Sequence, residues 1–181
     1  MDTRKISLLL ICCCLSIFSA LAQKQVTRTG SVSFYSSTPI EDIEANNSEA
    51  AAVLDTKTGA LLFIVPIKSF RFEKALMQEH FNENYMESDR YPKAEYKGKI
   101  LGQVNYNKEG TYPVTTKGAL TIHGVTKNVT VPGTLIVSKG TTTINAQFTV
   151  RVADYNIKIP AITASKIASQ IKINIHAILK P

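Results

Sequence analysis

The sequence predicts an all-β protein: an eight-stranded antiparallel β-barrel with one short helix between the third and fourth strands. Three observations lead to this fold class. Apolar and polar residues alternate in eight separate segments, which is typical of half-buried strands. These segments follow one another through short turns, which favours antiparallel pairing. Only the stretch 75–85 has helical periodicity.

Each predicted strand has at least one apolar face, and the strand at 60–67 is apolar on both. Eight such strands can bury these faces only by closing into a barrel or by packing as a two-sheet sandwich. We favour the barrel and keep the sandwich as the alternative. The strands are expected at 26–35, 48–55, 60–67, 94–104, 114–122, 129–137, 144–152 and 171–177. The acidic stretch 40–47 is expected to be a loop, and 155–168 a longer connection with apolar positions.

The first 22 residues match a secretory signal peptide. Arg4 and Lys5 precede the apolar run 6–18, and Ala20-Leu21-Ala22 provides a small-residue cleavage site. The run is shorter than the roughly 20 residues that span a bilayer. We therefore expect one domain over 23–181, exported to the periplasm or secreted. All three cysteines lie in the signal segment, so this domain can form neither disulfides nor thiolate metal sites.

The helical stretch carries Met77, Phe81 and Tyr85 at four-residue intervals, which places them on one face. Pro92 ends any helix before the next strand. An apolar helix face needs a surface to cover, and the remainder of the domain is β. We expect these three side chains to close one end of the barrel or to gate its mouth.

The inner positions of the predicted strands include unusually small residues. They have two explanations that the pattern leaves open: glycines at barrel corners, or space for a slim ligand. With an aliphatic and aromatic lining, such a cavity would suit an apolar chain. On the second explanation, leucine at Gly118 or Ala146 fills the cavity of a barrel that still folds. The small inner residues are Gly30, Gly98, Gly102, Gly118, Ala146 and Ala177.

We predict a ligand-binding set from the inward positions and the helix. Arg28 is the one charged residue on an inward face and is the candidate partner for a polar headgroup; alternatively, it lies at an exposed strand start. The predicted lining residues are Phe34, Tyr96, Ile100, Leu120, Phe148 and Ile173, with Met77, Phe81 and Tyr85 at the mouth.

Three ordered motifs resemble those of the YceI-like family of exported bacterial lipid-binding proteins. They are LMQEHFNENYMESDRYPKAEYKG at 76–98, GALTIHGVT at 118–126 and FTVRVADYNIKIP at 148–160. The resemblance extends over nearly all of 26–178 and is to the compact members of the family. It implies a lipocalin-like barrel with a hydrophobic tunnel that holds a polyisoprenoid or isoprenoid quinone. Because the loops are short, the tunnel is expected to be shorter or partly filled.

Other function classes find little support in the sequence. The formal net charge is +7, but the lysines are scattered along strands, which indicates a solvated outer face and no nucleic-acid partner. His80, His123 and His176 lack metal-site spacing, and no nucleophile or phosphate-loop motif occurs, so we expect neither a metal site nor an enzyme. The alternative is a filled barrel that acts as a protein-interaction or stress-response factor. The strand Leu61–Ile67 would then supply the contact, because it is apolar on both faces.

The expected ligand is a lipid or isoprenoid, and no cofactor is required. A transient contact with a membrane is compatible with this function. The sequence leaves open whether the protein is a monomer or a dimer.

Overall fold

The computed structural model describes residues 24–181, and the predicted signal segment 1–22 lies outside them. Nine strands and a few short helical segments make up the described chain. The strands are β1 Lys24–Ser37, β2 Asp42–Asp55, β3 Ala60–Pro66, β4 Arg71–Phe72, β5 Lys93–Leu101, β6 Gly110–Ile122, β7 Val125–Ser138, β8 Thr141–Arg151 and β9 Gln170–Leu179. The helical segments are η1 Ile67–Ser69, α2 Ala75–His80, η2 Phe81–Tyr85, η3 Val152–Tyr155 and η4 Ala161–Thr163.

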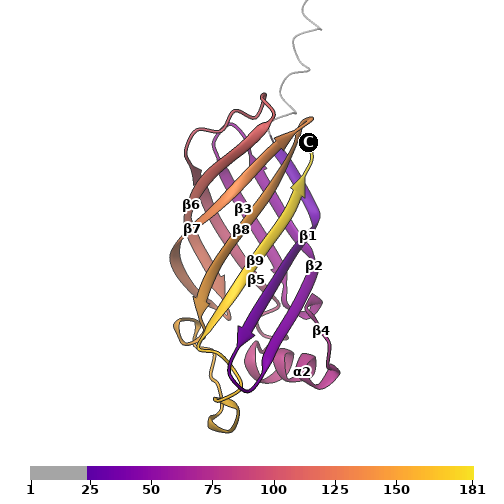
Figure 1. The fold of residues 1–181 in the computed structure, drawn as a ribbon, viewed down its shortest axis with the longest axis vertical. Helices are drawn as coiled ribbons and strands as arrows, with labels where there is room; N and C mark the ends of the chain where they lie inside the picture. Colours follow the sequence, from indigo (N-terminus) through magenta and orange to yellow (C-terminus); the bar gives the residue numbers. More distant parts are fainter. Residues whose placement is uncertain (1–23) are drawn as a thin grey trace, which may run out of the picture.

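The sheet closes on itself. Its strand order is β1-β9-β8-β7-β6-β5-β3-β2-β4, and β1 also pairs with β2, so that eight strands form a continuous antiparallel barrel (Figure 1). The ninth strand, β4, has only two residues and pairs with β2 beside the barrel. The predicted barrel is confirmed, and the sandwich is excluded because every neighbouring pair in the ring is hydrogen-bonded.

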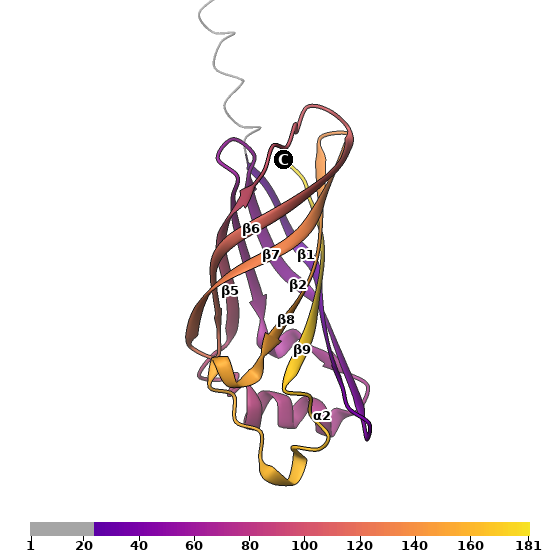
Figure 2. The ribbon, with the colours of Figure 1, turned by 60° about the vertical axis from the view of Figure 1, so that its left-hand side comes forward.

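The helix and the long connection lie at the same end of the barrel, opposite the C-terminus and the beginning of β1 (Figures 1 and 2). α2 packs against β4 and η2, and it does not lie along the outer face of β3. The predicted helix over 75–85 is present, but its second half, η2, is a π-helix. Within residues 24–181, no helix is long and apolar enough to cross a bilayer.

The expected loop at 40–47 is wrong, because β2 already begins at Asp42. This acidic stretch also carries an inward apolar face, on which Ala45 is fully buried. The Asn47 side chain is buried as well, and its amide donates to the Pro66 carbonyl at 2.8 Å. Because one polar side chain interrupts the alternation, the segment does not stand out as a strand in the sequence.

Arg28 does not point into the barrel, which agrees with the alternative of an exposed strand start and not with an inward position. The β1–β2 register shifts between Thr27 and Gly30, and a β-bulge of this kind reverses which side chains face inward. Before the bulge Gln25 is buried and Val26 is exposed, whereas after it Val32 is buried. Arg28 lies at the shift and is exposed.

The pair Gly98 and Gly118 brings β5 and β6 unusually close. A Cβ atom on Gly118 would lie 2.4 Å from the Gly98 Cα and nearer still to the Lys97 carbonyl oxygen. On Gly98, a Cβ would overlap the Tyr96 ring. These glycines are therefore sites of close backbone approach, and leucine at Gly118 would clash with β5 instead of filling a cavity.

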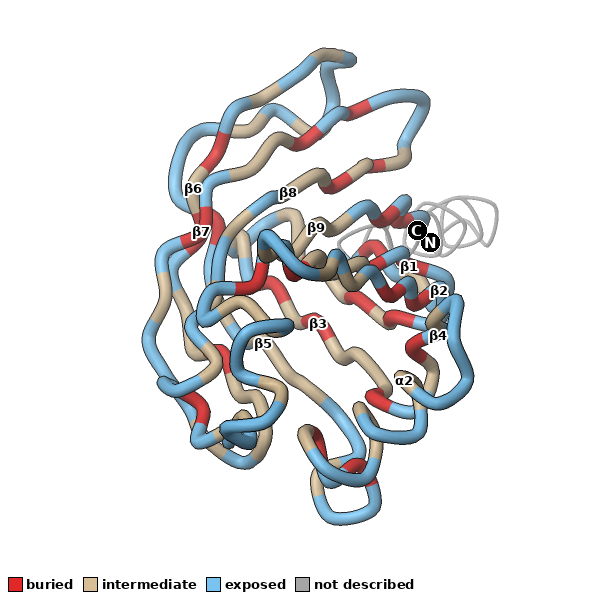
Figure 3. Tube along the Cα trace, turned by 60° about the horizontal axis from the view of Figure 1, so that its bottom comes forward, coloured by how far each residue is buried: buried red, intermediate tan, exposed pale blue. Residues whose placement is uncertain are grey.

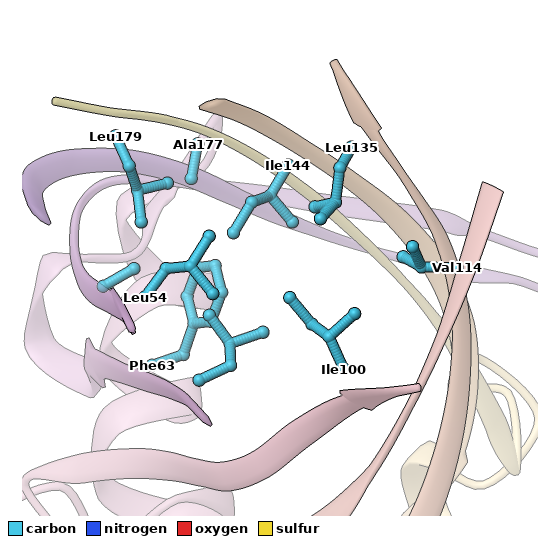
Figure 4. Packing of buried hydrophobic residues seen from close by; sticks show 10 residues of the cluster. Leu54, Phe63, Ile100, Val114, Leu135, Ile144, Ala177 and Leu179 are labelled. Atoms are coloured by element: carbon cyan, nitrogen blue, oxygen red, sulfur yellow. The ribbon is translucent and has the colours of Figure 1, made fainter. Parts of the chain in front are cut away.

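The end of the barrel nearest the C-terminus and the beginning of β1 holds a cluster of buried hydrophobic side chains. Leu54 and Leu179 are fully buried there, and Leu135, Ile144 and Phe63 reach the same interior from other strands (Figure 4). Several inward side chains of this cluster also form the inner limit of the cavity described next.

Candidate ligand cavity

A cavity of about 530 Å³ occupies the interior between the packed end and the helix. This volume falls within the range of small-molecule pockets, roughly 300–1,000 Å³. Its inner limit is formed by side chains that belong to the packed cluster: Leu61, Phe63, Ile100, Leu135 and Ile144. The barrel is therefore filled at one end and hollow toward the other.

Nine of the ten predicted binding residues line this cavity. Arg28 is the exception, because it lies at the register shift in β1 and is exposed. The nine are Phe34, Met77, Phe81, Tyr85, Tyr96, Ile100, Leu120, Phe148 and Ile173. They come from β1, the helical segments, β5, β6, β8 and β9, so the closed sheet is what brings them together. Their role in binding a ligand remains a prediction.

Four phenylalanine rings close much of the helical end. Phe81 on η2 lies against Phe34 of β1, with ring centroids 5.4 Å apart, and against Phe72 of β4 at 5.0 Å. Phe70 contacts both Phe34 and Phe81, at 5.4 and 5.6 Å. Aromatic pairs at these separations are mutually stabilising. The cluster attaches the helix to the barrel and forms an apolar wall of the cavity.

The connection between β8 and β9 also lies at this end. Ile157, Ile159 and Ile167 from this segment line the cavity. Hydrogen bonds join the connection to β1 and to η2: the Ala168 amide donates to the Ser36 hydroxyl oxygen at 2.9 Å, and the Tyr85 hydroxyl lies 3.3 Å from that of Thr163 in η4. The long connection is thus part of the cavity wall.

His123 links three segments at the same end. Its ring Nε2 lies 2.8 Å from a carboxylate oxygen of Glu87, and Nδ1 lies 3.2 Å from the carbonyl oxygen of Tyr155. The ring packs edge-on against Tyr91, at 4.5 Å between centroids. The β6–β7 turn, the segment after η2 and the segment η3 are therefore joined through one side chain.

The deepest polar groups of the cavity satisfy one another. The Tyr96 hydroxyl donates to the Thr116 hydroxyl oxygen at 2.7 Å. Burial raises the pKa of Tyr96 above its ordinary value, and the hydrogen bond with Thr116 acts in the opposite direction. Because these groups already have partners, the interior presents almost entirely apolar surface to a ligand.

Most of the charged or ionisable groups in the cavity lining lie at the helical end. Lys74 forms an ion pair with Glu41 at 3.4 Å, and His80 and Lys166 also line the cavity. Glu95 contributes to the lining too, and hydrogen bonds from the Lys97 and Lys93 ammonium groups hold its pKa below the ordinary value. An apolar interior with a polar rim suits an amphiphile whose chain is buried and whose head lies near water.

The cavity also reaches a seam in the wall. β7 and β8 pair only from Gly133–Ala146 to Ser138–Thr141, so residues 125–132 of β7 have no partner on β8. Pro132, Thr134 and Asn145, beside the last pair, line the cavity. A Cβ on Gly133 would lie 2.8 Å from the Asn145 carbonyl oxygen, which explains glycine at the point where the strands begin to diverge.

Sequence reasoning missed several lining residues. Phe70 and Phe72 precede the helix in a stretch with no evident periodicity, and only the aromatic content of this stretch could have indicated them. Ile157 and Ile159 were recognisable as apolar positions but not as cavity wall. Lys74, His80 and Lys166 could not have been found, because nothing in the local pattern places them at a rim.

The described residues offer no obvious metal centre. Among residues 24–181, no three His, Asp or Glu side chains are placed to hold an ion together. His80 is at the rim, His123 is in the turn contact, and His176 is on the barrel wall with Nδ1 2.7 Å from the Asn145 amide oxygen.

Comparison with known proteins agrees with this architecture. A family model described as the YceI-like domain matches residues 23–179, nearly the whole chain. The chain belongs to the YceI-like family. Among curated proteins, no significant match is found.

Solved structures with the YceI-like fold come from several bacteria. A polyisoprenoid-binding domain from Saccharophagus degradans, implicated in plant cell wall breakdown, has a TM-score of 0.75 at 12% identity, covering 87% of this chain and 98% of its own. BcnA of Burkholderia cenocepacia has a TM-score of 0.70 at 19% identity, with 84% and 96% covered. The YceI protein of Campylobacter jejuni has a TM-score of 0.57 at 20% identity, with 74% and 82% covered. At these identities the likeness shows a shared fold.

Proposed function

We propose that this YceI-like protein binds a long apolar ligand, a polyisoprenoid chain or an isoprenoid quinone, inside its barrel. The observation that carries the proposal is the cavity of about 530 Å³, whose interior polar groups satisfy one another. Burial of each ligand methylene favours binding by roughly 0.8 kcal/mol before ordering costs. The polyisoprenoid-binding domain with the same fold supports this ligand class.

The ligand would lie with its chain toward the packed end and its head at the rim. Phe63 and Ile144 limit how deep the chain can reach. Lys74, His80 and Lys166 then replace Arg28 as the candidate partners of a polar head. The role is binding, for storage or transport, with no chemical step.

The site of action would be the bacterial cell envelope or the exterior. The support is the signal-peptide pattern of residues 1–22. Fractionation of cells that produce the full chain, with mass determination of its N-terminus, tests this location. An N-terminus near Gln23 in the periplasm or medium is expected; an intact N-terminus in the cytoplasm would contradict export.

Native mass spectrometry of the protein purified from its own or a related bacterial host tests ligand binding directly. A stoichiometric adduct that organic solvent extracts as an isoprenoid or quinone is the expected result. A ligand-free mass that stays unchanged after incubation with a lipid extract would overturn the proposal.

A second candidate function uses the outer face of β3. Leu62 and Ile64 remain half-buried there, and their cross-strand neighbours Val53 and Ala51 are apolar as well. Among residues 24–181, no helix packs extensively against β3. If the protein carries no ligand, capture of a protein partner that is lost in Leu62→Asp, with unchanged folding, would favour an interaction role.

A further inference from the structure

The three most exposed large aliphatic side chains of the described chain belong to three different segments. Ile162 of η4 is 87% exposed, Ile40 of the β1–β2 turn 62%, and Leu76 at the start of α2 61%. The other exposed large aliphatics are between 37% and 47% exposed: Val26, Leu101, Ile136 and Ile178.

All three segments lie at the open end of the barrel. The β1–β2 turn, α2 and the gold-coloured connection that contains η4 project from the end opposite the C-terminus and the beginning of β1 (Figures 1 and 2). With this end brought forward, their tube is mostly coloured as exposed (Figure 3). Leu76 itself lines the cavity, as do Glu41 next to Ile40 and Thr163 next to Ile162. The exposed aliphatic groups therefore lie on or beside residues of the cavity lining at the helical end of the barrel, which we call the mouth.

Local hydrogen bonds hold these segments in shape. The Thr38 hydroxyl oxygen accepts from the amides of Ile40 and Glu41, at 3.3 and 3.1 Å. In η4, the Thr163 amide and hydroxyl both donate to the Pro160 carbonyl, at 3.0 and 3.1 Å. The aliphatic side chains are presented to solvent by ordered turns, which lowers the entropic cost of inserting them into another phase.

The charged residues at this end do not favour binding to an anionic surface. The segments at this end, 37–45, 67–92 and 151–169, contain seven Lys or Arg and nine Asp or Glu, whereas the rest of 24–181 contains twelve and four. An anionic surface would therefore attract the barrel wall and not the mouth. Any contact made by the mouth depends on burial of its aliphatic groups.

We propose that the mouth docks on a lipid bilayer, with Ile40, Leu76 and Ile162 inserted among the acyl chains at the interface. The proposal rests on the proposed ligand-binding function. An apolar ligand that moves directly between bilayer and cavity avoids exposure to water, and the side chains that surround the opening are those that favour an apolar phase. Because the aliphatic groups belong to three segments that are separate in the sequence, the β1–β2 turn, α2 and η4, they form no single strand or helix face of the kind that a folded protein partner would cover.

Flotation with phosphatidylcholine vesicles tests the docking. The test variant is Leu76→Ser with Ile162→Ser, and the matched control is Val26→Ser with Ile178→Ser, which removes two exposed aliphatic groups near the termini. We expect the mouth variant to lose vesicle partitioning by about tenfold or more and the control to keep it. High salt should leave wild-type partitioning unchanged, because the mouth does not bind through charge.

Three results would overturn the docking proposal: equal partitioning of both variants, release of the wild type by salt, or no partitioning at all. Native mass spectrometry of the same preparations separates the two proposals. Bound ligand without docking would leave the proposed function standing. Docking without any bound ligand would support the membrane-docking proposal and refute the proposed ligand-binding function.

Discussion

The ring of Phe81 on η2 stacks on the ring of Phe34 on β1, with centroids 5.4 Å apart and planes inclined by 27°. Both side chains line the cavity. This pair joins the helical segment η2 to the first strand at the helical end of the barrel. The helical end of the barrel is thus covered in part by side chains that would contact the proposed ligand.

Replacing Phe81 by alanine should open this end. We expect faster ligand release and a loss of about 2 kcal/mol in the free energy of unfolding, less than for a fully buried Phe because Phe81 is half-buried. Urea denaturation and ligand-release kinetics measure the two effects. Glu79→Ala, on an exposed position of α2, is the control and should alter neither.

Replacing Ala146 by leucine should reduce the cavity. Ala146 lines it on β8, so the added carbons occupy space that the ligand needs. Ligand occupancy, measured by native mass spectrometry, should fall while the protein still folds, with a cost of roughly 1–3 kcal/mol if the site is tight. Thr149→Leu, exposed on the same strand, should keep full occupancy. Equal occupancy in both variants would mean that the ligand does not reach Ala146.

Replacing Gly118 by alanine should destabilise the barrel. The new Cβ would overlap backbone atoms of Lys97 and Gly98, which cannot move without separating β5 from β6. A loss of about 3 kcal/mol or more in the free energy of unfolding is expected from thermal or urea denaturation. Gly110→Ala, on the same strand, meets only ordinary contacts at 3.5 Å and beyond, and it should be nearly neutral.

Replacing His123 by phenylalanine should loosen the β8–β9 connection. The ring contact with Tyr91 is kept, but the contacts with Glu87 and the Tyr155 carbonyl are lost. Hydrogen exchange of amides in 152–169 should accelerate by about tenfold, since each lost hydrogen bond contributes about 1 kcal/mol. His176→Ala, on the barrel wall, should leave the amides of 152–169 protected. If this variant accelerated their exchange as much as His123→Phe, the effect would not be specific to the contacts of His123.

Stability should decline at alkaline pH. Burial raises the pKa of Tyr96, Tyr106 and Tyr155 above the ordinary value of 10.0. The folded state therefore retains protons that the unfolded state releases. The contribution of these three tyrosines to the free energy of unfolding is fully present below about pH 10. It is lost as the pH rises through their pKa values in the folded state. Denaturation midpoints between pH 8 and 12 measure this loss, and Tyr96→Phe should make it shallower.

The sequence by itself determined the fold class and nine of the residues that line the cavity. Alternation with a period of two identifies strands, and it also decides which side chains face inward once the sheet is closed. Phe34, Tyr96, Leu120 and Phe148 could be assigned to the interior for this reason. The four-residue spacing of Met77, Phe81 and Tyr85 likewise identified the helical segment that closes one end.

Only the tertiary structure decided where the alternation of inward and outward side chains fails, and which parts of the barrel interior are filled and which are empty. The bulge near Arg28 depends on pairing with β2, so no local pattern reveals that the arginine is outside. The backbone of the neighbouring strand leaves no room for a Cβ atom on Gly118, whereas Ala146 borders a cavity. In the sequence, both are simply small residues at inward positions. The rim of Lys74, His80 and Lys166 assembles from distant segments. Local periodicity records the direction of a side chain, whereas close approach, empty volume and convergence arise only when separate strands meet.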